Sequence, residues 1–234
     1  MPFTDEKSQQ TEASCQNANQ PAKTKARTYA GKSLEDRKRF RRQQFLKAGL
    51  CVFGELGFRQ ASVRRLCKEA QLTDRYFYEE CGNLETLLVD VYQQCMTNVS
   101  KKILNAIVSE YAQSKDPEKA IISGLEAYFS ALENHQVARI CMLELEGLNP
   151  EVTALYNCYI ESFSEILRQL AKHAFPDMTL PVSEQKIIAL SLVGAMRQTA
   201  THWLTNNYDT ERSELVSATS KLFSGMIALL ARHN

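Results

Sequence analysis

The chain has 234 residues, which is enough for one large domain or two small ones with a sizeable buried core. Hydrophobic residues make up 44% of it and charged residues 24%, a composition that excludes a disordered, collagen-like or disulfide-scaffold protein. The formal net charge is only +1, yet residues 1–80 carry 16 Lys and Arg against 10 Asp and Glu, whereas residues 81–234 carry 12 against 17. We expect the basic first third to meet a polyanion, although chance clustering of solvated charges would give the same imbalance.

Several classes of protein and site are disfavoured by features that the sequence lacks. It has no run of about 18 apolar residues, and its first 20 residues hold no apolar signal region, so we expect a cytoplasmic, nucleoid-associated protein with no membrane partner. The seven cysteines form no CxxC pair and no zinc-ligand spacing with the four histidines, and their odd number argues against a disulfide framework. We therefore expect no metal and no cofactor.

The chain is expected to begin with a basic arm that leads into a helix. Residues 1–32 show no periodicity, and residues 21–32 read PAKTKARTYAGK, which predicts a flexible arm. Ser33 and Asp36 form a capping-box-like pair, with acidic groups where the helix dipole favours them. Apolar residues at helical spacing continue to Leu56, and Gly57 is a natural C-terminal stop.

Two short helices and a long one are predicted next. Ser62 caps a helix whose apolar residues follow at i, i+3, i+4 and i+7, and residues 71–73 form a turn. Thr73 caps a second short helix that runs from Asp74 to about residue 80, and Asn83 caps a long third one. Two short helices joined by a three-residue turn are the helix-turn-helix arrangement, whose second helix enters the major groove of DNA.

The remainder of the chain is predicted to be helical, with no strands. The expected helices cover residues 117–133, 136–147, 150–174, 183–206 and 210–232. Pro117 and Pro150 lie at first-turn positions, where a missing N–H costs little. Small residues in the last two helices permit close approach of another helix, either within the chain or in a dimer interface.

Residues 57–79, GFRQASVRRLCKEAQLTDRYFYE, followed by ETLL at 85–88, resemble the DNA-binding region of the TetR family of bacterial transcription regulators. The resemblance covers about residues 33–92 and rests on the spacing, the turn and the aromatic-Tyr recognition helix. It implies an all-α protein with a flexible basic arm at 1–32, a three-helix helix-turn-helix domain at 33–82 and a larger helical ligand-binding and dimerisation domain at 83–234. It further implies double-stranded operator DNA, a second copy of the chain and an unidentified small-molecule effector as partners.

Four positions depart from the family pattern. Ala61 and Leu84 stand where the family usually has a Thr and a basic residue that contact phosphates, and Cys81 replaces the usual aromatic residue. Losing two phosphate contacts would weaken DNA binding and flatten its salt dependence, which the basic stretch 32–42 is expected to offset. Gln71 replaces the turn glycine, so a non-glycine backbone conformation is expected there at a modest cost.

The second short helix is expected to carry most of the DNA contacts. Phe77 should face the core, so the side chains of its neighbours should point outward. Arg75 is suited to bond guanine O6 and N7. Tyr78 resembles the family's phosphate-bonding tyrosine. Asp74 would accept from cytosine N4 or only stabilise the helix start, and each of these residues could instead be a plain surface side chain. The expected DNA-contacting residues are Ser62, Asp74, Arg75, Tyr76, Tyr78, Lys32 and Arg41.

An effector pocket is implied behind this domain, lined by polar or aromatic groups within apolar helices. The candidates are Tyr128, Cys141, Tyr159, Phe163, Met196 and Trp203, although each could equally be a core residue. Arg139 with Glu144 and Glu146 would form an ion pair or bind a charged ligand. No motif of a nucleotide-binding, hydrolytic or metalloenzyme site occurs, so we expect no enzyme.

The resemblance therefore implies a homodimeric DNA-binding regulator in which an effector shifts the dimer away from a geometry that fits DNA. Repression is the commoner outcome in such families, and no residue here excludes activation. Two alternatives stay open. One is a DNA-bound adaptor that has no effector. The other is a helical small-molecule sensor or carrier that has lost DNA binding, as the residues at 61, 81 and 84 would allow.

Overall fold

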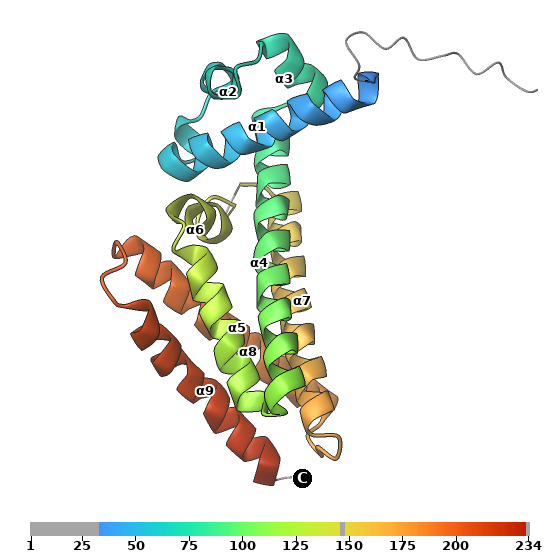
Figure 1. Cartoon of the computed structure of the whole chain (residues 1–234), viewed down its shortest axis with the longest axis vertical. Helices are drawn as coiled ribbons and strands as arrows, with labels where there is room; N and C mark the ends of the chain where they lie inside the picture. The colour runs from blue at the N-terminus through green and yellow to red at the C-terminus, as the bar shows by residue number, and fades with distance from the viewer. Residues whose placement is uncertain (1–32, 146–147, 233–234) are drawn as a thin grey trace, which may run out of the picture. The chain divides into compact units, whose positions relative to one another are not determined.

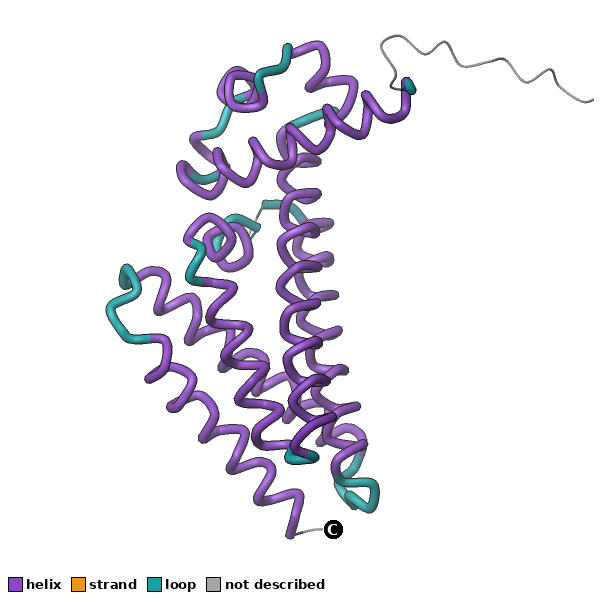
Figure 2. The backbone as a smooth tube through the Cα atoms, viewed as in Figure 1, coloured by secondary structure: helices purple, strands orange, loops and turns teal. Residues whose placement is uncertain are grey.

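The computed structural model describes residues 33–145 and 148–232, and the predicted arm with Lys32 lies outside this range. The predicted boundary between residues 82 and 83 stays a prediction. The described residues fold into helices joined by short loops, with no strand among them (Figure 2). The expected all-α class is confirmed for this part of the chain.

Helix α1 (Leu34–Leu56) begins at the predicted capping box. The Ser33 hydroxyl accepts from the Asp36 N–H at 3.0 Å, and the Asp36 carboxylate accepts from the Ser33 N–H at 3.2 Å. The helix ends before Gly57, whose φ of 80° favours glycine. A 3-10 turn, η1 (Phe58–Gln60), follows it.

The helix-turn-helix consists of α2 (Val63–Ala70) and α3 (Asp74–Cys81). The Ser62 hydroxyl caps α2 by accepting from the Arg65 N–H. The expectation of a non-glycine turn is wrong, because Gln71 adopts the left-handed conformation with φ 54° and ψ 39°. The turn is a Schellman motif, in which the Leu72 N–H donates to the Cys67 carbonyl at 3.0 Å and the Gln71 N–H to the Lys68 carbonyl at 3.3 Å, and these bonds impose that conformation on residue 71.

The remaining helices are α4 (Leu84–Ser114), α5 (Pro117–Leu132), α6 (His135–Met142), α7 (Pro150–Ala174), α8 (Val182–Thr205) and α9 (Arg212–Arg232). Four of the five helices predicted beyond residue 116 match within two residues. The fifth, expected over 136–147, ends at Met142, because the carboxylate of Glu144 bonds the Phe58 N–H at 2.7 Å and draws the chain out of the helical path.

One continuous hydrophobic core joins the helix-turn-helix to the helices behind it. Helix α4 packs along α5, α5 along α9, and α7 along α8 (Figure 1). Phe45, Phe53 and Phe77 are fully buried in the helix-turn-helix region, and Phe129 is fully buried between the longer helices. Among the described helices, none combines the length and the apolar character that crossing a bilayer requires.

Candidate functional site

Helix α3 presents a mixed face, with one aromatic side chain buried and polar groups exposed beside it. Phe77 is 0% exposed and packs edge-on against Phe45 with ring centroids 5.5 Å apart, as the sequence predicted. Tyr78, the next residue, is 60% exposed. Asp74 and Arg75 are exposed at the start of the helix, which is the end that approaches base edges in this motif.

The guanidinium of Arg75 is available at the surface. Its side chain is 82% exposed, and its Nε atom donates to Glu79 Oε1 at 2.8 Å one turn along α3. An exposed pair at this spacing is weak because water screens it, so a guanine edge can replace the glutamate. Asp74 Oδ1 accepts from the Arg75 N–H at 2.9 Å, which matches the second of its two expected roles, stabilising the helix start.

Arg41 and Tyr76, both expected to contact DNA, contact each other in the structure. The Arg41 guanidinium lies 4.5 Å from the Tyr76 ring centroid and donates from Nε and Nη2 to Glu80 Oε1 at 2.8 and 2.5 Å. The Arg41 and Glu80 side chains are only 15% and 7% exposed. Tyr76 is therefore half-buried rather than outward-facing, and Arg41 is compensated by a carboxylate. Both residues fix α3 against α1.

A second arginine extends this attachment to α4, and sequence reasoning missed it. Arg42 donates to the Glu80 carbonyl and, at 2.7 Å, to Asp90 Oδ2. Glu80 and Asp90 lie 38 and 48 residues from Arg42 in sequence. No local pattern could have paired them.

Helix α2 adds exposed cations that were not singled out from the sequence. Arg64, Arg65 and Lys68 are all exposed, whereas Leu66 between them is fully buried. In a helix-turn-helix this helix crosses the phosphate backbone, so cations here could offset the missing contacts at Ala61 and Leu84. The run of basic residues directly after the Ser62 cap was the sequence signal that could have identified these cations.

Three of the four departures from the family pattern lie in or beside the core. Ala61 and Leu84 are half-buried and pack against it. Cys81 is 2% exposed, and burial raises the pKa of its thiol to about 11. These residues support the position of α3 and leave its exposed face intact.

A cavity of about 40 Å³ lies among α4, α5, α6, α7 and α8, and we call it the arginine cavity. Four of the six predicted pocket residues line it, together with Arg197, which the sequence reasoning missed. Its lining residues are Tyr92, Met96, Val99, Tyr128, Leu132, Cys141, Met142, Tyr156, Ile160, Phe163, Val193, Met196 and Arg197.

The other two predicted pocket residues, Tyr159 and Trp203, do not line the arginine cavity. Tyr159 packs edge-on against Tyr92 at 5.5 Å. Trp203 is 4% exposed and packs edge-on against Tyr208 with ring centroids 4.7 Å apart, and its Nε1–H donates to the Thr210 carbonyl at 2.8 Å. Trp203 thus fastens the connection between α8 and α9.

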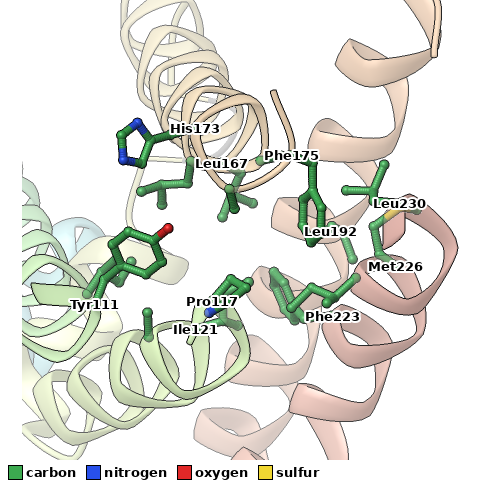
Figure 3. Close-up of a pocket in the computed structure, with 16 residues that line it drawn as sticks. Tyr111, Pro117, Ile121, Leu167, His173, Phe175, Leu192, Phe223, Met226 and Leu230 are labelled. Carbon is green, nitrogen blue, oxygen red and sulfur yellow. The ribbon is translucent and has the colours of Figure 1, made fainter. Parts of the chain in front are cut away.

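The arginine cavity continues into two more apolar spaces. A middle cavity of about 40 Å³ shares Phe163, Val193 and Met196 with it. A far cavity of about 90 Å³ shares Ile107 and Leu167, among others, with the middle one. Figure 3 shows the far cavity, where apolar side chains from five helices surround one space, with Tyr111 and His173 at its edge.

Fifteen residues of α4 separate Met96 in the arginine cavity from Tyr111 in the far cavity, which at 1.5 Å per residue is about 22 Å. The three cavities therefore follow the length of the helices as a row of apolar spaces. Their adjoining linings mark a path for an elongated, hydrophobic ligand.

Two tyrosines and a cysteine of the arginine cavity carry hydroxyl and thiol groups that resist deprotonation. Burial raises the pKa of the Tyr92 and Tyr128 hydroxyls. A hydrogen bond with Cys95, together with burial, holds the pKa of the Cys141 thiol well above its usual range. The guanidinium of Arg197 belongs to the same lining as these groups.

Helix α6 connects this cavity to the helix-turn-helix. Arg197 Nη2 donates to the Met142 carbonyl at 3.1 Å, at the last residue of α6. Two residues later, Glu144 accepts from the Phe58 N–H at 2.7 Å and from Arg139 Nε at 2.7 Å. The ion-pair alternative for Arg139 and Glu144 is confirmed, and Glu146 lies outside the described residues.

Helices α8 and α9 expose large apolar side chains. Val182, Ile187 and Leu190 on α8 are 58%, 65% and 49% exposed. Leu222 on α9 is 52% exposed. A Cβ atom added at Gly194 or Gly225 would meet nothing within 4 Å, so both helices have open space beside them in a single chain.

No family model matches the chain. Its sequence is 22% identical over 193 residues to the fatty acid metabolism regulator protein of Bacillus subtilis, covering 82% of this chain and 96% of the relative.

Solved structures resemble the fold. The crystal structure of the regulator FadR from Bacillus subtilis in complex with stearoyl-CoA matches with a TM-score of 0.67 and 20% identity, covering 77% of this chain and 96% of that one. A TetR-like transcriptional regulator from Rhodococcus matches with a TM-score of 0.62 and 16% identity, covering 80% and 96%. The chain has the fold of TetR-family transcriptional regulators, as the resemblance in its sequence implied.

Proposed function

We propose that this chain, which has the TetR-type fold, is a homodimeric, sequence-specific DNA-binding repressor whose affinity for its operator is controlled by a small molecule with a long apolar chain. The observation that carries the DNA-binding part is the surface of α3. Its core-facing side chain, Phe77, is fully buried, while Arg75 and Tyr78 beside it are largely exposed. A guanidinium and a phenol displayed in this way suit a guanine edge and a phosphate oxygen.

A second copy of the chain is the occupant that we propose for the exposed apolar face of α8 and α9. Apolar side chains at positions 182, 187 and 190 of α8 and 222 of α9 lie in solvent in a single chain. A two-fold dimer would bury them and would present two recognition helices to successive major grooves about 34 Å apart.

The effector that we propose is a long-chain acyl compound. An extended acyl chain of about sixteen to eighteen carbons, with carbon–carbon bonds of about 1.5 Å in a zigzag, is roughly 20 Å long. The row of cavities offers a path of about that length along α4. The similarity to a fatty acid metabolism regulator supports the same class of ligand.

Entry of such a chain must change the arrangement of the helices. The arginine cavity and the middle cavity, at about 40 Å³ each, have room for only a few atoms. The lining helices must spread to admit the chain, and a ligand that binds the spread form more tightly shifts the population toward it. That form is the one proposed to lose its fit to DNA.

The alternatives differ in what they predict for the two sites. A DNA-bound adaptor would bind DNA with an affinity indifferent to acyl compounds. A carrier that has lost DNA binding would bind acyl compounds and discriminate no DNA sequence. The exposed Arg75 and the exposed cations of α2 favour the regulator over the carrier.

Fluorescence anisotropy on DNA fragments from around the protein's own coding region tests the proposal. We expect one fragment to bind tightly and with salt sensitivity, palmitoyl-CoA to weaken that binding, and Arg75→Ala to abolish it. Lys102→Ala, which removes an exposed cation from α4, is the matched control and should bind as the wild type does. Weak binding that is equal on all fragments and indifferent to Arg75 would overturn the DNA-binding claim.

A further inference from the structure

We propose that Cys95 and Cys141 form a dithiol site that a peroxide closes to a disulfide, and that this bond holds α4 and α6 in the arrangement that fits DNA. The reaction of the two sulfurs is independent of the proposed function. Its consequence for DNA binding rests on the proposed function, because it acts on the response to the acyl effector.

The two thiols come from different helices and meet beside the arginine cavity. Cys95 lies on α4 and Cys141 on α6, and both are buried, at 6% and 4% exposure. A hydrogen bond joins their side chains. Helix α4 packs against α6, and the residues at positions 92, 96 and 99 of α4 line the cavity as Cys141 does. The packing of two helices therefore holds the two sulfur atoms together at one side of this space.

The hydrogen bond gives the two thiols different roles. It lowers the pKa of the Cys95 thiol and, together with burial, raises the pKa of the Cys141 thiol. Cys141 is therefore the donor and Cys95 the acceptor, and such a bond favours the thiolate on Cys95. The thiolate is the form of cysteine that attacks a peroxide. Cys95 is thus the nucleophile, and Cys141 is the thiol that closes the disulfide.

One peroxide and both thiols complete the reaction. The Cys95 sulfur attacks one oxygen of the O–O bond, which breaks, so that Cys95 becomes a sulfenic acid. The other oxygen takes up the Cys95 proton and leaves as an alcohol, or as water when the oxidant is hydrogen peroxide. The Cys141 sulfur then attacks the sulfenic sulfur, and the displaced hydroxyl group leaves as water with the Cys141 proton. The two sulfurs lose one electron each, and the peroxide gains both.

The arginine cavity has room for the reactive group of a peroxide. Its volume is about 40 Å³, whereas a cavity of about 10–15 Å³ is enough for a water molecule. A hydroperoxyl group therefore fits beside Cys141. The adjoining middle cavity is lined by apolar residues and one glycine, which suits the chain of an organic hydroperoxide. A peroxide is neutral, so it enters these spaces without the desolvation cost of an ion.

The disulfide would join two of the helices that must spread to admit the effector. A disulfide fixes its two sulfurs about 2.05 Å apart and the two Cβ atoms about 3.8 Å apart. Such a link between α4 and α6 opposes the spread form and favours the closed one. Cys141 also precedes by three residues Glu144, which bonds the Phe58 N–H. The oxidised chain should therefore keep its DNA affinity and lose its response to acyl compounds.

Treatment of the full chain with hydrogen peroxide, and in a second arm with a long-chain fatty acid hydroperoxide, tests the pair. We expect one disulfide between Cys95 and Cys141, seen as a mass lower by two hydrogen atoms and located by fragmentation of unreduced peptides. Dithiothreitol should reverse it. The faster peroxide tells an aqueous oxidant from a lipid one. Free thiols at both positions after oxidation of other cysteines or of the cavity methionines would overturn the proposal.

Single substitutions separate the two thiols. Cys95→Ala should leave Cys141 as a free thiol, whereas Cys141→Ala should leave a sulfenic acid on Cys95 that dimedone traps. Cys158→Ser, which removes an exposed thiol from α7, is the matched control and should form the disulfide as the wild type does. If an alanine variant does not fold, the linked peptide of the wild type still decides. The same loss of two hydrogen atoms in both alanine variants would refute the pairing.

DNA binding supplies the readout for the consequence. Palmitoyl-CoA should weaken operator binding of the reduced protein at least about fivefold and that of the oxidised protein by no more than about twofold. Peroxide-treated Cys95→Ala should respond as the reduced wild type does. A disulfide that leaves the response unchanged would contradict the role of the bond. If the wild type binds neither DNA nor any acyl compound, the proposed function fails, and the linked peptide alone then decides whether the dithiol site exists.

Discussion

Replacing Arg41 by methionine separates the two roles that the sequence and the structure give to this residue. Methionine keeps an apolar stem but removes the guanidinium that lies over the Tyr76 ring and donates to Glu80, which is 7% exposed. Removing one partner of a buried ion pair costs about 3–5 kcal/mol, and the partial exposure of Arg41 brings the expected loss in the free energy of unfolding to about 2 kcal/mol.

A double-mutant cycle measures the free energy of the interaction between Arg41 and Glu80. With Glu80→Gln as the second change, urea unfolding followed by circular dichroism should give a coupling energy of about 1–2 kcal/mol between the two side chains. Glu80→Gln alone should also destabilise the protein, because it leaves the guanidinium without its carboxylate.

DNA binding supplies the contrasting readout. If Arg41 only positions α3, Arg41→Met weakens DNA binding without altering the slope of log K against log salt. A residue that contacts a phosphate would reduce that slope by about 0.9. A reduced slope in a protein of unchanged stability would refute the positioning role and restore the contact expected from the sequence.

Three further outcomes follow from single positions. Gln71→Gly relieves a left-handed non-glycine residue and should raise the free energy of unfolding by about 1 kcal/mol, and a decrease would contradict the turn geometry. Ile187→Glu places a charge on the exposed face of α8 and should convert dimer to monomer in analytical ultracentrifugation, whereas an unchanged dimer would place the interface elsewhere. The folded state raises the Cys81 pKa from 9.0 to about 11, so its contribution is complete below pH 9 and is lost as pH rises toward 11. The free energy of unfolding should therefore fall by up to about 2 kcal/mol relative to Cys81→Ala across that window, and parallel pH profiles would contradict the shift.

The helix boundaries were predictable because the signals that set them are local. Ser33, Ser62 and Asn83 accept hydrogen bonds from the backbone three residues later, as the sequence indicated. Pro117 and Pro150 begin their helices as expected. A capping side chain and the N–H group that it bonds are neighbours in sequence, so no knowledge of the fold is needed to pair them.

The conformation of residue 71 was mispredicted for an instructive reason. The prediction took the backbone preference of glutamine as decisive, whereas the Schellman hydrogen bonds of the turn set the conformation. The cost of a left-handed glutamine, about 1 kcal/mol, is small against the packing that the turn secures. The motif therefore persists with a residue that is intrinsically unsuited to it.

The partners of Arg41, Arg42 and Arg197 were beyond prediction from one sequence. Each guanidinium bonds a group 38 or more residues away, on another helix. Pattern reasoning could identify the charges but could not pair them, so Arg41 was assigned to DNA and Arg197 was overlooked. The same limit applies to Trp203, whose edge-on contact with Tyr208 depends on how α8 and α9 are connected.

Selection of binding sites from random DNA by the full chain is the most direct test of the central claim. We expect the enriched sites to be palindromic, with half-sites about 10 base pairs apart or a multiple of that. We expect Arg75→Ala to lose one guanine preference in each half-site. A library that shows no enriched sequence, or enriched sites that Arg75→Ala leaves unchanged, would contradict recognition of DNA by α3.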